Sequence, residues 1–196
     1  YSGSIVNDFY VNNLENQSLL NLVMKMIPQC ETVLIPQFPL GIMPTQFTVK
    51  GIYPEDLKDG FTAHMMLNLD LNSIDDPGKH IEIFRLTDSN GSFLSVFVSD
   101  SMILTKYESS GLRTTVALAK MPPANIYTDF TFIYKINENR IRISCFQNLS
   151  PLNDSDFVYF EFASGELTLS VGGYYENYKT IYQYGILKNF ALFPTT

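Results

Sequence analysis

The chain consists of short runs of alternating apolar and polar residues divided by turn-forming segments, and this pattern limits the fold more than any other feature. The alternation is clearest in Ile81–Leu86 and Thr131–Ile136. A period of two places the apolar side chains on one face of a β-strand, so the other face is exposed to solvent. About a dozen such runs, with no helices alternating between them, predict an all-β protein with antiparallel sheets.

The turn residues predict two hairpins. The Asn90-Gly91 pair favours a tight turn in one hairpin that covers residues 81–98. The segment Asn137-Glu138-Asn139 predicts the turn of a second hairpin, which covers residues 130–145. Further runs of β character are 32–35, 46–50, 61–71, 102–106, 157–162, 166–171 and 186–193. We therefore expect a two-sheet antiparallel jelly-roll sandwich.

The N-terminal region differs from the rest because its apolar residues recur at helical spacing. From Leu19 to Ile27 the pattern predicts a short helix, which Pro28 ends because the residue before a proline is pushed out of the α region. We expect residues 1–29 to pack as a helical segment on the sandwich. The length of 196 residues is consistent with a single domain over residues 1–196.

The charge of the chain disfavours polyanionic partners, and its hydropathy disfavours insertion into a membrane. The 13 Lys and Arg residues against 20 Asp and Glu give a net charge of -7, which disfavours nucleic acids and heparin-like polysaccharides. No apolar run approaches the roughly 20 residues that span a bilayer, so we expect no membrane insertion by this segment. Its first residues lack the features of a signal peptide, so the chain resembles a mature segment of a longer protein.

Cysteines and sequons favour a secreted or cell-surface location. The two cysteines, Cys30 and Cys145, are far apart, which suits one long-range disulfide better than a metal site. Two buried thiols in a cytosolic domain are the alternative. Four Asn-x-Ser sequons, some of which an Asn-rich chain produces by chance, offer glycosylation sites at Asn16, Asn90, Asn148 and Asn153.

A tyrosine-rich segment is the first candidate for a binding surface. Tyrosine gives large, rigid, amphipathic contact area and is enriched at recognition surfaces. The alternative is that these rings only cover one end of the sandwich. The tyrosines are Tyr174, Tyr175, Tyr178, Tyr182 and Tyr184.

Catalytic patterns are absent from the sequence, so we expect no enzyme. Sandwich glycanases need closely spaced carboxylates on one strand, whereas Asp154 and Asp156 lie in a polar segment typical of a solvated turn. With His64 and His80 as the only histidines, the spacing favours neither a triad nor a zinc site.

Two charged groups allow both a functional and a structural interpretation. The acidic residues Asp70, Asp75, Asp76 and Glu82 are candidate calcium ligands or a charged loop tip. Lys135, Arg140 and Arg142 form either a small basic patch for an anionic partner or a solvated sheet face.

Three segments resemble the laminin G-like domains, in particular their thrombospondin N-terminal-like branch. The strand-turn-strand unit Asp129–Cys145 resembles the family's pattern, Gly165–Gly173 resembles its GxLxLGG strand, and Ile186–Phe193 resembles its final strand, which returns to the first sheet. The chain departs from the family at Tyr127-Thr128, where Trp-His is common, and at Ser144, where Asp is usual. A more distant concanavalin A-like sandwich is the alternative.

The resemblance implies a function and several residue roles. It implies a concanavalin A-like jelly roll and a disulfide between Cys30 and Cys145. Some members of the family hold a calcium ion at one rim, for which Asp88 or Asp100 are the candidate ligands here, although we expect no required cofactor. It also implies an extracellular module that mediates adhesion through protein or matrix contacts. The alternatives are a lectin-like, calcium-assisted carbohydrate-binding domain and a self-associating structural domain.

Overall fold

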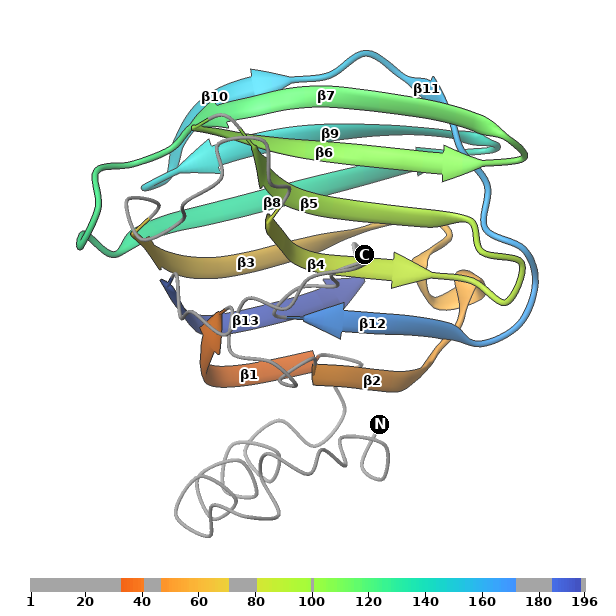
Figure 1. Cartoon of the computed structure of the whole chain (residues 1–196). Coiled ribbons are helices and arrows are strands. Elements are labelled where there is room, and N and C mark those ends of the chain that lie inside the picture. Colours follow the sequence, from red (N-terminus) through yellow and green to blue (C-terminus); the bar gives the residue numbers. More distant parts are fainter. Residues whose placement is uncertain (1–32, 41–46, 71–80, 100, 172–184, 195–196) are drawn as a thin grey trace, which may run out of the picture.

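Two antiparallel β-sheets pack face to face in the computed structural model of this protein, which describes residues 33–40, 47–70, 81–99, 101–171 and 185–194 (Figure 1). Sheet A contains, in spatial order, β1 (Val33–Leu40), β13 (Gly185–Pro194), β3 (Gly60–Leu69), β8 (Thr128–Asn137), β9 (Arg140–Gln147) and β10 (Ser150–Asp154), with β11 (Val158–Tyr159) paired to β9. Sheet B contains β2 (Phe47–Ile52), β12 (Leu167–Val171), β4 (Ile81–Thr87), β5 (Phe93–Ser99), β6 (Met102–Ser109) and β7 (Leu112–Lys120). A short 3-10 turn, η1 (Pro54–Leu57), precedes β3. The predicted all-β sandwich is confirmed.

Both predicted hairpins are present. Strands β4 and β5 pair from Thr87 and Phe93 outward, and Gly91 in their turn has a φ of 85°. Strands β8 and β9 pair from Asn137 and Arg140 outward, through a turn in which Glu138 has a φ of 54°. The final strand β13 lies between β1 and β3, so the end of the described chain returns to the sheet that holds the first strand.

Aromatic side chains from both sheets fill the core between them. Phe84 of sheet B meets Phe190 of sheet A edge to face, with ring centroids 5.7 Å apart. Within sheet A, the rings of Phe61 and Tyr134 stack at 4.5 Å, and both side chains are fully buried. Such aromatic pairs stabilise a fold by about 0.5–1.5 kcal/mol beyond the area that they bury.

A small polar group lies inside this apolar core. The Thr105 hydroxyl donates to the carbonyl oxygen of Ser95 at 3.0 Å and lies 3.5 Å from the Tyr134 hydroxyl. Burial raises the pKa of the Tyr107 and Tyr134 hydroxyls well above their usual range, because an apolar surrounding disfavours the charged phenolate. These hydroxyls therefore stay protonated at neutral pH and serve the packing between the sheets.

The strand pattern differs from the prediction at one edge of each sheet. The edge strands β7 and β10 were not among the predicted runs. Strand β7 follows β6 through a turn at Gly111, and β10 contains a proline, which an edge strand tolerates. The run 157–162, predicted as a strand, pairs only over Val158–Tyr159. Beyond this pair, the Phe160 N–H donates to Asn139, and the Ser109 hydroxyl donates to the carbonyl oxygen of Glu161. The segment therefore crosses from sheet A to sheet B.

The predicted N-terminal helix, within residues 1–29, lies outside the described residues and stays a prediction. In the part of the chain that the structure describes, no helix is both long enough and apolar enough to cross a bilayer.

Candidate functional site

The register of three strands brings charged and apolar side chains together on the outer face of sheet B, the face that is turned away from sheet A. In β6, Ile103, Thr105 and Tyr107 are buried in the core, so the intervening side chains point outward. Phe97 of β5 is the cross-strand partner of Leu104, and Thr115 of β7 is the partner of Lys106. Figure 1 shows β5, β6 and β7 side by side in this sheet.

These side chains surround an open hollow of about 410 Å³. Pockets that hold small ligands have volumes of roughly 300–1,000 Å³, an apolar lining and a few placed polar groups. The hollow has this combination. Its lining residues, which we call the β5–β7 hollow, are Phe97, Ser99, Met102, Leu104, Lys106, Arg113 and Thr115.

Glu108 orients the cationic end of the hollow. Its Oε2 atom accepts from Arg113, with both Nε and Nη2 at 2.8 Å, and lies 4.0 Å from Lys106 Nζ. The Arg113 side chain is 62% exposed, so part of its guanidinium faces solvent beside the hollow. One carboxylate therefore serves two cations here, and Arg113 holds it more closely than Lys106 does.

A second ion pair lies next to this end. Arg85 Nε donates to Glu82 Oε1 at 2.7 Å, and the Arg85 guanidinium lies 4.1 Å above the centre of the Phe93 ring. Lys106 Nζ lies over the same ring at 5.2 Å. Three cations, Arg85, Lys106 and Arg113, thus gather around two carboxylates, on a chain that is acidic as a whole.

The electrostatics of Lys106 reflect its partial burial first and the neighbouring positive charge second. Burial of the ammonium group lowers the pKa of Lys106, and the neighbouring Arg113 lowers it further, while Glu108 opposes the change. A lowered lysine pKa means that the charged form is less well solvated than in water. An anion placed in the hollow would therefore restore favourable surroundings to this ammonium group.

The predicted tyrosine surface, Tyr174 to Tyr184, lies outside the described residues, as do Asp75, Asp76, His80 and Asp100. These predictions stay untested. Glu82, one of the proposed calcium ligands, is buried and pairs with Arg85. Among the described residues, no three His, Cys, Asp or Glu side chains gather in a way that would hold a metal ion.

Asp88, a candidate calcium ligand that the family resemblance implied, has a structural role. Its Oδ1 accepts from the backbone N–H groups of Asn90 and Ser92 at 2.9 and 2.8 Å, and its Oδ2 accepts from Ala163 at 2.7 Å. The carboxylate is buried and ties the β4–β5 turn to the segment before β12. Three N–H donors already point at its oxygens, so the arrangement favours a turn clamp over a cation ligand.

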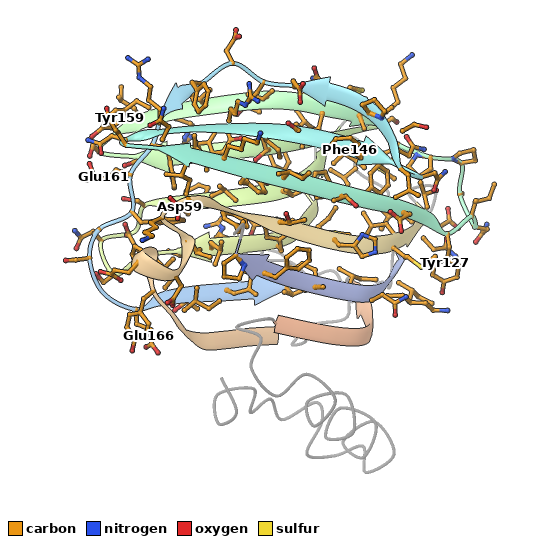
Figure 2. All side chains as sticks on the ribbon, turned by 180° about the vertical axis from the view of Figure 1, so that it is seen from behind. Asp59, Tyr127, Phe146, Tyr159, Glu161 and Glu166 are labelled. Atoms are coloured by element: carbon orange, nitrogen blue, oxygen red, sulfur yellow. The ribbon has the colours of Figure 1, made fainter. Side chains whose placement is uncertain are left out.

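The basic residues Lys135, Arg140 and Arg142 lie on β8 and β9 at the outer surface of sheet A. Lys135 and Arg142 are cross-strand partners, as predicted for the hairpin. Arg142 is only partly exposed, and its guanidinium lies 5.3 Å from the centre of the Phe157 ring. Figure 2 shows this face, with Tyr159 near one end and Phe146 near the other.

The same face carries an Asp-His-Thr group that the sequence spacing did not predict. His64 Nδ1 lies 3.0 Å from Thr131 Oγ1, and His64 Nε2 lies 3.4 Å from Asp129 Oδ2. Cross-strand pairing of β3 with β8 brings the three together. Hydrolases that act by acyl transfer also aim N–H donors at an oxyanion, whereas the backbone of β3 pairs with β13 on one side and β8 on the other. We assign no chemical role to this group.

Acidic residues gather at one end of the sandwich, where Figure 2 shows Asp59, Glu161 and Glu166. Two of them have structural partners. Glu166 Oε1 accepts from the Gly51 N–H at 2.8 Å, and Glu161 Oε2 accepts from the Tyr159 hydroxyl at 3.3 Å. We assign no separate site to this end.

The asparagines of the described sequons differ in whether their side chains take part in hydrogen bonds. Asn90 is exposed in the β4–β5 turn, whereas Asn153 Nδ2 donates to the carbonyl oxygen of Ala117 at 2.7 Å. The Asn148 Oδ1 accepts from the Asp129 N–H at 3.2 Å. Asn16 lies outside the described residues. Glycosylation itself stays a prediction, with Asn90 the site that the fold accommodates most easily.

Cys145 is the one cysteine among the described residues, and it is buried in the core. Cross-strand pairs connect it in one row through β8, β3 and β13 to Val33 of β1. Four strand spacings make this row about 19 Å long, and a disulfide needs Cα atoms within about 7 Å. The three residues from Val33 to Cys30 span at most about 10 Å. Even a straight path would leave the two Cα atoms about 9 Å apart on this estimate, beyond the reach of a disulfide unless the curvature of the sheet shortens the row. The disulfide stays a prediction.

A free thiol at Cys145 would make stability depend on alkaline pH. Burial raises the pKa of Cys145 from 9.0 to about 12, so the folded state keeps the proton that the unfolded chain loses. Stability from this group is complete below pH 9 and is lost as the pH rises toward 12. Urea titrations over this range should show a loss of at most about 4 kcal/mol.

The buried tyrosines add to this loss of stability above pH 10. A variant without the thiol is therefore needed to measure the contribution of Cys145 alone. The Cys145→Ala variant should show a smaller decline between pH 9 and 10 than the wild type. Identical slopes for the two proteins would mean that Cys145 does not titrate, as in a disulfide.

The residues of the β5–β7 hollow were not singled out from the sequence as functional. Lys106 was placed in a predicted strand, but Arg113 had no predicted partner because the β6–β7 hairpin was not recognised. The Ser109-Ser110-Gly111 segment was the available signal, since Gly111 has a φ of 77° and forms the turn.

Comparison with known proteins shows which folds this chain resembles and assigns it to no family. No family model matches the sequence, and no curated protein matches it. The chain is similar in structure to the botulinum neurotoxin serotype D binding domain, with a TM-score of 0.60, 10% identity, and 84% of this chain but 43% of that chain covered. The binding domain of Paraclostridial Mosquitocidal Protein 1 gives a TM-score of 0.60 at 11% identity, over 83% of this chain and 42% of that chain.

A carbohydrate-binding domain matches over nearly its whole length. The Ruminococcus gnavus IT-sialidase CBM40, solved with alpha2,3 sialyllactose bound, has a TM-score of 0.55 and 9% identity, over 83% of this chain and 90% of that chain. The chain therefore spans less than half of the toxin binding domains and most of the length of this one. These similarities show the two-sheet sandwich fold and do not single out the laminin G-like branch.

Proposed function

We propose that this chain is a non-catalytic recognition module of a secreted or cell-surface protein, and that it binds a glycan in the β5–β7 hollow. The observation that carries the proposal is the hollow itself. Its lining combines the apolar side chains of Phe97, Met102 and Leu104, which we call the floor, with hydroxyl groups and two cations. Such a mixture suits a sugar, whose ring has both apolar and hydroxyl-bearing faces.

The structural neighbours add support of a different kind. The toxin domains are described as binding domains, and the sialidase domain was solved with a bound saccharide. All share the sandwich, on which binding sites differ while the scaffold stays the same. The extracellular setting rests on the sequons and on the disulfide predicted from the two cysteines of the sequence.

A substitution that occupies the hollow tests the proposal. Thr115→Glu places a carboxylate next to its cross-strand partner Lys106, so it should fill the hollow without harming the fold. On an array of neutral and acidic glycans, we expect the wild type to bind and the variant to lose at least about tenfold in affinity. The melting temperatures of the two proteins should agree.

Asn137→Glu is the matched control, since it adds the same charge at an exposed position of β8 in the other sheet. It should bind like the wild type. Binding of no glycan by the wild type would contradict the proposal, and unchanged binding by Thr115→Glu would move the site elsewhere.

A second candidate function, adhesion through a protein partner, is favoured by exposed apolar side chains near the β10 edge of sheet A. Leu149 is 85% exposed, and Leu152, Phe157 and Tyr159 are also exposed. They follow the length of β9, from Leu149 beyond its Gln147 end to Tyr159 opposite Arg140, and large exposed apolar side chains on one edge mark protein contacts. In a pull-down with a candidate partner, Leu149→Ser and Phe157→Ser should lose capture, whereas Thr115→Glu should not.

A further inference from the structure

The charges around the β5–β7 hollow narrow the class of ligand, provided that the proposed glycan-binding function holds. We propose that the ligand is a saccharide with a single negative charge, a carboxylate or a sulfate, which is held between Lys106 and Arg113. Its uncharged part would lie on the floor formed by Phe97, Met102 and Leu104.

The number of charges favours one negative charge on the ligand. Glu82 is paired with Arg85 at 2.7 Å, and Glu108 is paired with Arg113 at 2.8 Å. Lys106 then has only the second, longer contact to Glu108, at 4.0 Å. Among the residues that the structure describes, the three cations of this cluster thus outnumber its two carboxylates by one, which a singly charged group balances and a doubly charged phosphate exceeds.

The geometry also gives the anion a direction of approach. Arg113 uses Nε and Nη2 for Glu108, which fixes the plane of the guanidinium and leaves its other N–H groups as donors. Lys106 Nζ is held over the Phe93 ring on the neighbouring strand. Both cations line the same hollow, so an oxyanion seated there receives charge-assisted hydrogen bonds from both.

The choice of a saccharide over an acidic peptide rests on the remaining lining. Ser99 and Thr115 add hydroxyl groups to the hollow, and together with the apolar floor they match a ring that carries hydroxyls around an apolar face. The volume of the hollow, about 410 Å³, lies in the range of sites that hold a compact ligand.

The test measures the affinity of the purified protein for four probes by calorimetry. The probes are lactose, alpha2,3-sialyllactose with a carboxylate, 3'-sulfated lactose, and a tetraglutamate peptide. We expect the singly charged saccharides to bind at least about tenfold more tightly than lactose, and raising the salt from 50 to 500 mM to weaken only the charged ones.

The variant Lys106→Met keeps the length of the side chain and removes its charge. It should lose about tenfold in affinity for the singly charged saccharides and a smaller factor for lactose, which has no charge for Lys106 to bind. Lys135→Met, on the outer surface of sheet A, is the control and should bind as the wild type does.

The outcomes separate this inference from the proposed function. Equal affinity for lactose and the charged saccharides, both lost in Thr115→Glu, would overturn the charge requirement and leave glycan binding in place. Binding of the peptide as tightly as the saccharides would overturn the choice of ligand class. Failure of all four probes would contradict both the inference and the proposed function.

Discussion

Replacing Gly60 with alanine is expected to destabilise the fold by about 4 kcal/mol or more. Gly60 begins β3 with a φ of 118°, a backbone conformation that residues with a Cβ atom rarely adopt. A Cβ atom at this position would also collide with the carbonyl oxygen of Tyr134, which belongs to the backbone of β8. Backbone strain and overpacking each cost about 1–3 kcal/mol, and here they add. Urea denaturation gives the free energy of unfolding directly.

Gly91→Ala separates the two causes. Gly91 also has a positive φ, of 85°, but a Cβ atom there would meet nothing within 4 Å. This variant should lose only the strain energy, about 1–2 kcal/mol. If the two variants proved equally stable, β3 and β8 would not approach each other as closely as the structure shows at Gly60.

The second large effect is expected at Asp88. The Asp88→Ala variant removes the acceptor of three backbone N–H groups, those of Asn90, Ser92 and Ala163. Hydrogen bonds to a charged acceptor contribute about 1.5–3 kcal/mol each, and water replaces part of this at the exposed turn. We expect a total loss of about 3–5 kcal/mol, measured by thermal and urea denaturation.

Asp88→Asn keeps one acceptor oxygen and should lose roughly half as much. Asp59→Ala, at an exposed position, removes the same charge and should change stability by less than about 0.5 kcal/mol. Adding calcium should leave the melting temperature of the wild type unchanged. A calcium-dependent rise that Asp88→Asn abolishes would show that Asp88 is a cation ligand and not a turn clamp.

Local sequence signals predicted much of the sandwich. The Asn90-Gly91 turn and the alternation in β8 and β9 were sufficient for two hairpins, because each signal acts between residues close in the chain. Strand β7 was missed since it lies at a sheet edge, where its exposed residues Leu112, Arg113 and Thr115 do not produce a clean alternation. The mixed burial of edge strands weakens the signal on which the prediction relies.

The site depended on contacts that no local signal contains. The pairing of Lys106 with Thr115 and of Phe97 with Leu104 follows from the register of three strands, and a shift by one residue would turn every side chain to the other face. The Asp129, His64 and Thr131 group has the same origin, since β3 and β8 are far apart in sequence. Tyrosine content, in contrast, was visible in the sequence and indicated residues that the structure does not describe.

Methyl resonances of methionine offer the most direct test of the central claim, which is that ligand binds over β5, β6 and β7. Met102 lines the hollow, whereas Met66 lies partly exposed on β3 in the other sheet. With methyl-labelled methionine, titration with alpha2,3-sialyllactose should shift the Met102 signal, assigned through Met102→Leu, and leave Met66 in place. Saturable binding that shifts Met66 while Met102 stays unmoved would contradict the account.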